Sequence, residues 1–204
     1  MTNPLRGRRQ LLFYFGLGAM GAGGLAALRT SFRKDSTSTA TSTSTATSAV
    51  TATVAVPPLP KRQPLSEFQG ITQWLNSPPL TVAGLKGKVV LLQFWTFGCS
   101  VCQLTLPYLT RWHQQYADQG LQVIGVHTPE FPYERDVNRI KSSLKRAQIT
   151  YPVPIDNEFQ TWSVYQERFW PHLYLADRDG IIRFDYAGAG AYPETEQAIR
   201  TLLG

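Results

Sequence analysis

Two cysteines, Cys99 and Cys102, are the side chains whose type and spacing point most directly to a chemical reaction. They follow an almost continuous apolar run, residues 89–95, and open a segment with helical spacing, residues 104–119. We therefore expect the pair at a helix N-terminus, where free N–H groups and the helix dipole stabilise a thiolate. The first cysteine is expected to face solvent and the second to lie one turn inside. Attack by Cys99 on a substrate disulfide would give a mixed disulfide that Cys102 resolves.

Other uses of two cysteines fit this sequence less well. A disulfide scaffold needs more pairs, widely separated along the chain. A structural zinc site needs two further ligands at matching spacing. The chain has 204 residues, of which 43% are hydrophobic and 12% aromatic, and this composition excludes a wholly disordered protein.

The net charge of +6 does not indicate nucleic-acid binding, because it is confined to the N-terminal segment. Residues 1–34 contain six basic side chains and no acidic one. In residues 35–204, 14 basic side chains are balanced by 14 acidic ones. A phosphate-binding surface needs a clustered excess of positive charge, so we predict no nucleic-acid partner.

The N-terminal segment, residues 1–34, has the pattern of an export signal or a membrane anchor. The adjacent pair Arg8-Arg9 favours the twin-arginine route, and the uncharged run 11–28 is barely long enough to cross a bilayer. Cleavage of the signal and its retention as an anchor therefore both stay open. Residues 35–64 follow as a Ser/Thr/Ala/Pro-rich linker, since they contain no aromatic side chain with which to build a core.

The remainder, residues 65–204, has the composition of one folded domain. Apolar runs predict buried strands over residues 89–95 and 121–126, with the helix 104–119 between them. Further elements are expected as a helix over residues 132–147, a strand over 151–155, a short helix over 158–165, a hairpin of strands 173–175 and 181–184, and a last helix from about residue 193. Alternating strands and helices imply an α/β sandwich, and the hairpin makes its central sheet mixed.

The segment Phe94-Trp95-Thr96-Phe97-Gly98-Cys99-Ser100-Val101-Cys102 resembles the active-site segment of the thioredoxin superfamily. Pro107 falls where that superfamily has a helix-kinking proline. Several stretches are similar to exported thioredoxin-like domains of the DipZ and TlpA/ResA type, the DipZ form in particular: residues 74–80, 125–131, 170–171 and 192–196. The resemblance covers about residues 65–204. It implies a thioredoxin-like three-layer α/β/α sandwich with a redox-active Cys99–Cys102 disulfide and no other cofactor or metal.

The resemblance also assigns residues that would bind the substrate. Pro171 matches the cis-proline of the superfamily, which packs against the redox pair. Trp170, directly before it, would offer its backbone to an extended client segment, while its side chain packs in the core or contacts the client. Trp95, four residues before the first cysteine, is placed in the same substrate-binding set.

Two departures from thioredoxin affect the expected chemistry. Gln93 stands where thioredoxin has a buried aspartate, and because glutamine cannot shuttle a proton, deprotonation of Cys102 needs another base. We expect Glu130 in that role, since similar exported proteins place a glutamate in this loop; a solvated carboxylate is the alternative. Ser100 and Val101 supply no cation to stabilise the reduced thiolate, so we expect a reducing or mildly reducing protein.

The leading functional hypothesis is an exported thiol–disulfide oxidoreductase that acts on client proteins. The resemblance implies roles in cytochrome c maturation or in an electron relay, with a separate CcdA- or DipZ-like membrane protein as electron donor. The expected location is the periplasm or the thylakoid lumen side, and the expected state is a monomer. The alternative is a Cu(I)-binding module that uses Cys99, Cys102 and His172, because soft thiolates suit that ion. A peroxidase is a third, weaker option.

Overall fold

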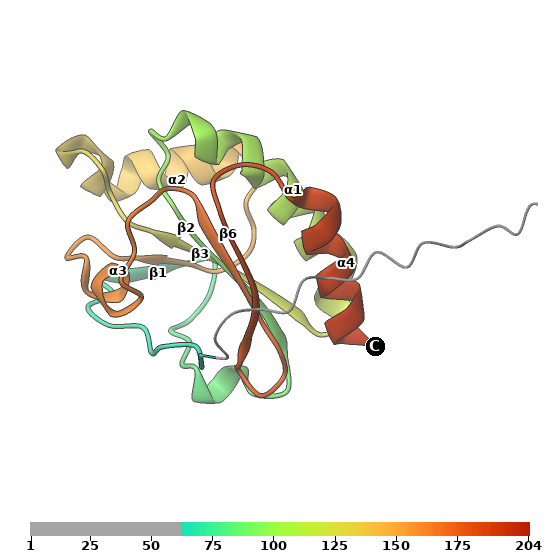
Figure 1. Ribbon diagram of the computed structural model, residues 1–204. Helices are drawn as coiled ribbons and strands as arrows, with labels where there is room; N and C mark the ends of the chain where they lie inside the picture. The colour runs from blue at the N-terminus through green and yellow to red at the C-terminus, as the bar shows by residue number, and fades with distance from the viewer. Residues whose placement is uncertain (1–62) are drawn as a thin grey trace, which may run out of the picture. The chain divides into compact units, whose positions relative to one another are not determined.

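A computed structural model describes residues 63–204 of the chain (Figure 1). The strands and α-helices of this part are, in chain order, β1 (Gln73–Leu75), β2 (Val89–Trp95), α1 (Ser100–Tyr116), β3 (Leu121–His127), α2 (Val137–Arg146), β4 (Val153–Ile155), α3 (Gln160–Val164), β5 (His172–Ala176), β6 (Ile182–Ala187) and α4 (Tyr192–Leu203). Three short 3-10 helices accompany them: η1 (Ala83–Leu85), η2 (Ala117–Gln119) and η3 (Pro132–Arg135).

The strands form one mixed sheet in the order β1-β4-β3-β2-β5-β6. β2 pairs with β3 in parallel and with β5 in antiparallel orientation, so it lies inside the sheet. The hairpin β5-β6 is antiparallel and turns at residues 177–180, where the Gly180 N–H donates to the Asp177 carbonyl. The mixed sheet and its terminal hairpin are confirmed.

The central strand β2 is buried along its whole length, and its side chains alternate between two cores. Val89, Leu91 and Trp95 belong to the core that also contains apolar side chains of α1, α2 and α4. Val90, Leu92 and Phe94 belong to a second core on the opposite face. That second core is covered by η1, the short α3 and the N-terminal stretch of the domain, so the layer predicted there consists largely of irregular chain (Figure 1).

The helix α1 spans 17 residues, begins directly after Cys99 and contains Pro107. The helix predicted over residues 104–119 is confirmed, but it starts earlier, at Ser100, and ends at Tyr116, where η2 follows. The helix α1 packs against α4, where the rings of Tyr108 and Tyr192 stack with centroids 3.6 Å apart and Tyr116 donates a hydrogen bond to Glu196. These contacts fix the helix whose N-terminus carries the redox pair.

The single helix expected over residues 132–147 is wrong, because the chain breaks at Asp136. Asp136 has extended backbone angles, and its side chain accepts the N–H groups of Asn138 and Arg139 as the N-cap of α2. The preceding 3-10 turn, η3, runs from Pro132 to Arg135 and ends at this same Asp136. The sequence also did not predict β1, which has three residues and depends on its pairing with β4.

The predicted export signal, residues 1–34, lies outside the described residues, as does nearly all of the predicted linker, residues 35–64. Within residues 63–204, no helix combines the length and apolar character required to cross a membrane.

Candidate active site

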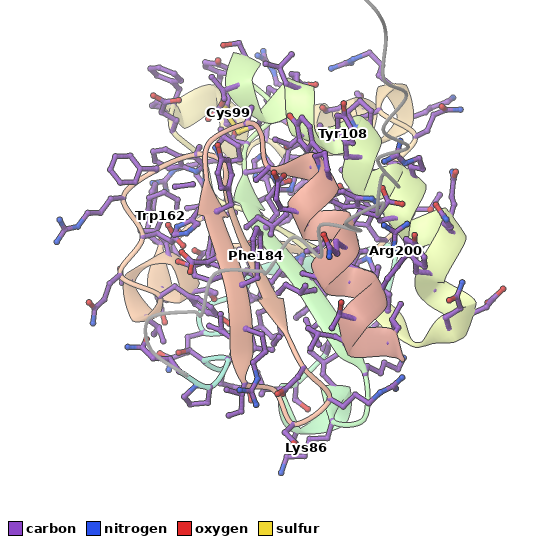
Figure 2. All side chains as sticks on the ribbon, turned by 45° about the vertical axis from the view of Figure 1, so that its right-hand side comes forward. Lys86, Cys99, Tyr108, Trp162, Phe184 and Arg200 are labelled. Carbon is purple, nitrogen blue, oxygen red and sulfur yellow. A yellow bond between two sulfur atoms is a disulfide. The ribbon has the colours of Figure 1, made fainter. Side chains whose placement is uncertain are left out.

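The two cysteines lie at the N-terminus of α1 and form a disulfide, with Cα atoms 5.2 Å apart. Cys99 is the N-cap residue, and its Sγ accepts the backbone N–H of Cys102 at 3.0 Å. Cys102 is fully buried, whereas Cys99 is half-buried and accessible. Figure 2 shows the sulfur atoms beside the labelled Cys99, where α1 begins. One sulfur is thus available to a substrate, and it receives a hydrogen bond that favours its thiolate form.

The Trp170–Pro171 peptide bond is cis, as the resemblance implied. The backbone ladder of β5 begins only at His172, so Trp170 lies outside it. The Trp170 side chain is half-buried, stacks on Trp162 with centroids 4.1 Å apart, and donates its indole N–H to the Thr128 carbonyl. The side chain is thus held by a ring stack and a hydrogen bond, and it is partly exposed.

Trp95 lies in a different environment from the one predicted for a substrate-binding residue. Its side chain has no exposed surface and packs edge-on against His127, with ring centroids 5.3 Å apart. Because β2 alternates its side chains, the tryptophan at the end of the strand enters the core beneath α1. The structure therefore places Trp95 under the active site and out of reach of a client.

Gln93 lies next to Thr105, in the region where thioredoxin carries its buried acid. Its side-chain amide donates to the Thr105 hydroxyl at 2.8 Å, and that hydroxyl donates to the Cys102 carbonyl at 2.8 Å. Both side chains are buried. The series of hydrogen bonds that links the sheet to Cys102 contains only neutral groups. The proton acceptor for this cysteine therefore has to come from elsewhere.

The loop after β3 carries two glutamates with contrasting environments. Glu130, the predicted base, has an exposed side chain. Glu134, in η3, is fully buried, and its Oε2 accepts the backbone N–H groups of Glu130 at 2.6 Å and Phe131 at 3.0 Å. Glu134 could not be singled out from the sequence, because it lies in a segment with the pattern of a charged, solvent-facing helix.

His127 ends β3 beneath the active-site loop and is fully buried. Its ring stacks on Phe97 with centroids 5.7 Å apart, and its Nε2 lies 3.3 Å from the Thr96 hydroxyl. Burial lowers the pKa of His127 to about 4, and a backbone hydrogen bond offsets only part of this lowering. The ring is therefore neutral at pH 7.

His127 is expected to contribute a loss of stability between pH 6.5 and pH 4. In this range the unfolded state binds a proton at the histidine and the native state does not, so acid favours unfolding. Each pKa unit of difference corresponds to about 1.4 kcal/mol, which gives a loss of about 3 kcal/mol over this range. Urea unfolding of the oxidised protein at several pH values measures this loss. The variant His127→Phe should show a flatter pH profile; identical profiles would remove His127 as the cause.

His172 follows the cis-proline, but its ring belongs to a separate polar cluster. Its Nδ1 lies 2.9 Å from Glu167 Oε2 and its Nε2 lies 3.3 Å from Asp185 Oδ2, while Tyr174 donates its hydroxyl to Glu167. Burial lowers the pKa of His172, but the hydrogen bonds and charges of Glu167 and Asp185 outweigh it and raise the pKa above its usual value.

The Cu(I) ligand set predicted from Cys99, Cys102 and His172 is not assembled in the structure. Within residues 63–204, no group of three His, Cys, Asp or Glu side chains is arranged to hold a metal ion. The reason is local, because both ring nitrogens of His172 already face carboxylates.

Comparisons with known proteins agree with this geometry. A family profile described as the AhpC/TSA family matches residues 64–185. The chain belongs to this family. Its fold is thioredoxin-like: the solution structure of a thioredoxin-like protein in the oxidised form matches with a TM-score of 0.64 and 29% identity, over 70% of this chain and 95% of that one.

Two curated relatives extend the comparison. Protein DipZ of Mycobacterium bovis is 42% identical over 140 residues, which cover 67% of this chain and 20% of DipZ. The thiol-disulfide oxidoreductase YkuV of Bacillus subtilis is 28% identical over 142 residues, which cover 70% of this chain and 95% of YkuV. The chain therefore spans about a fifth of the length of DipZ and almost the whole of YkuV.

Proposed function

We propose that this chain is an exported thiol–disulfide oxidoreductase that reduces disulfides in client proteins. The observation that carries the proposal is the Cys99–Cys102 disulfide at the start of α1, with one sulfur accessible and the other buried. The similarity to YkuV, which is named as a thiol-disulfide oxidoreductase, supports the reaction class.

The proposed reaction transfers two electrons from the cysteine pair to a client disulfide. The Cys99 thiolate attacks one client sulfur, forms a mixed disulfide and releases the other client sulfur as a thiolate. Cys102 then loses its proton and attacks Cys99 Sγ, which restores the internal disulfide and releases the second client thiolate. The backbone of Trp170, before the cis-proline, is proposed to hold the client segment in extended form.

The protein is proposed to act as a monomer in the periplasm or on the thylakoid lumen side, brought there by residues 1–34 as a cleaved signal or an anchor. A CcdA- or DipZ-like membrane protein is the proposed source of electrons, because the cysteine pair has to be reduced again after each turnover. Clients in cytochrome c maturation fit the same chemistry.

An insulin-reduction assay beside a Cu(I) titration tests the proposal. We expect the protein to accelerate the precipitation of insulin by dithiothreitol. We also expect its equilibrium with glutathione to give a reducing potential for the Cys99–Cys102 couple, so that the disulfide form is favoured. Tight, stoichiometric Cu(I) binding without insulin reduction would favour the metal-binding alternative instead.

Replacing Glu130 by glutamine tests the proposed base. If the exposed Glu130 carboxylate accepts the Cys102 proton, Glu130→Gln should slow resolution of the mixed disulfide by about a hundredfold or more, the range for general bases. Stopped-flow measurement of mixed-disulfide decay reports this step directly. An unchanged decay rate and an unchanged thiol titration would remove Glu130 from the mechanism.

A further inference from the structure

Glu134 is a buried carboxyl group that the proposed reaction does not use. Its Oε2 caps two backbone N–H groups of the loop after β3, which fixes the carboxyl plane. Its Oε1 is buried and has no hydrogen-bond partner in the described part of the chain. A buried polar atom without a partner is costly, so its retention calls for an explanation.

The unpartnered oxygen lies against the reactive loop. A Cβ built on Gly98 would overlap Glu134 Oε1 and would lie 2.7 Å from the Tyr133 hydroxyl, so only glycine fits at this position. The oxygen is thus in contact with Gly98, and because neighbouring Cα atoms are about 3.8 Å apart, it lies within about 7 Å of the Cys99 Cα. Gly98 lets a buried carboxylate approach the attacking cysteine.

Other titratable groups near this loop do not offset that carboxylate. The first turn of α1 has no acidic side chain, His127 is neutral and buried, and Glu130 is exposed to solvent. Arg139 lies over the Tyr133 ring at 6.0 Å, but its side chain is exposed and pairs with Asp136 at 3.9 Å. Glu134 is therefore the buried acidic group in contact with the loop that carries Cys99.

We propose that Glu134 is a positioning residue whose charge opposes the thiolate of Cys99 and thereby keeps the cysteine pair reducing. A like charge in a poorly solvated site disfavours a second negative charge. The carboxylate counteracts the helix N-terminus, destabilises the reduced thiolate and shifts the dithiol–disulfide equilibrium toward the disulfide. This inference rests on the proposed function and extends it to the residue that sets the redox balance.

The variant Glu134→Gln removes the charge and keeps the shape. Its amide oxygen still accepts the N–H groups of Glu130 and Phe131, and its NH₂ group faces Gly98. We expect the pKa of the Cys99 thiol to fall by about one unit. In the exchange of the protein disulfide with two glutathione molecules, the equilibrium constant for forming the dithiol should rise roughly two- to fivefold.

Thiolate absorbance of the reduced protein as a function of pH, together with the glutathione equilibrium, gives the two readouts. Glu194→Gln, at an exposed position on α4, is the matched control and should change neither. Glu134→Asp keeps the charge but withdraws it from Gly98, so a smaller shift in the same direction is expected; it also serves if the glutamine variant does not fold.

An unchanged or raised Cys99 pKa in folded Glu134→Gln would overturn the inference, and so would an unchanged value in Glu134→Asp if only that variant folds. Insulin reduction by the wild type tests the proposed function separately. If the wild type reduces insulin but the pKa of the Cys99 thiol is unaltered in Glu134→Gln, only the role of Glu134 is refuted and the proposed function stands.

Discussion

Replacing Cys99 by serine is expected to lower the rate of protein disulfide reduction by about a thousandfold or more, to the level of dithiothreitol alone. Cys99 is the half-buried, accessible member of the pair, and its Sγ receives the Cys102 N–H at the helix N-terminus. Serine at this position has no thiolate to offer. The insulin-reduction assay measures the loss, and unchanged unfolding in urea would show that the fold is intact.

The variant Cys102→Ser is expected to block a later step, the release of the client from Cys99. Cys99 still attacks, but no second thiol releases the client, so mixed disulfides accumulate. Non-reducing gels of an extract of an export-competent host should show protein adducts that dithiothreitol removes. The variant Cys99→Ser, which keeps only the buried Cys102, is the control and should form none. Adducts on the control, or none on Cys102→Ser, would contradict the assigned order of attack.

Replacing Trp95 by alanine is expected to destabilise the oxidised domain by about 3–5 kcal/mol, the range for a fully buried aromatic side chain. Trp95 has no exposed surface, and a Cβ added to Gly125 would lie 2.9 Å from its Nε1, so the ring fits closely against β3. Its loss leaves a cavity beneath the active-site helix that rigid strands on both sides cannot fill. Equilibrium unfolding in urea measures the change.

The variant Trp170→Phe provides a comparison, because Trp170 is expected to contribute less to stability than Trp95. It keeps an aromatic ring against Trp162 and removes the hydrogen bond to the Thr128 carbonyl, so a loss of about 1 kcal/mol is expected. A loss below about 1 kcal/mol for Trp95→Ala would show that the ring is not a core element and would reopen its assignment to substrate binding.

The parts of the fold that depend on local pattern could be predicted from the sequence. The apolar run of β2 and the helical spacing of α1 are strong signals, and together they placed the cysteines at a helix N-terminus. The resemblance supplied the cis bond before Pro171, which composition and spacing do not determine.

The parts that depend on tertiary contact could not be predicted. β1 is a strand because it pairs with β4, and its three residues carry too little pattern of their own. The sequence pattern around Glu134 is that of a solvent-facing charge, whereas in the structure the side chain is buried against Gly98. The break before α2 did have a signal, since Asp136 is a favourable N-cap residue, but the continuous charge pattern obscured it.

Cys99, activated at the start of α1, is the proposed attacking sulfur, and Cys102 is the proposed resolving one. Timed alkylation of the reduced protein, followed by mass spectrometry of its peptides, tests this assignment. We expect iodoacetamide to modify Cys99 first, with a rate that rises with pH as its thiolate forms, and the singly modified protein to be inactive. Faster modification of Cys102, or full activity with Cys99 alkylated, would contradict it.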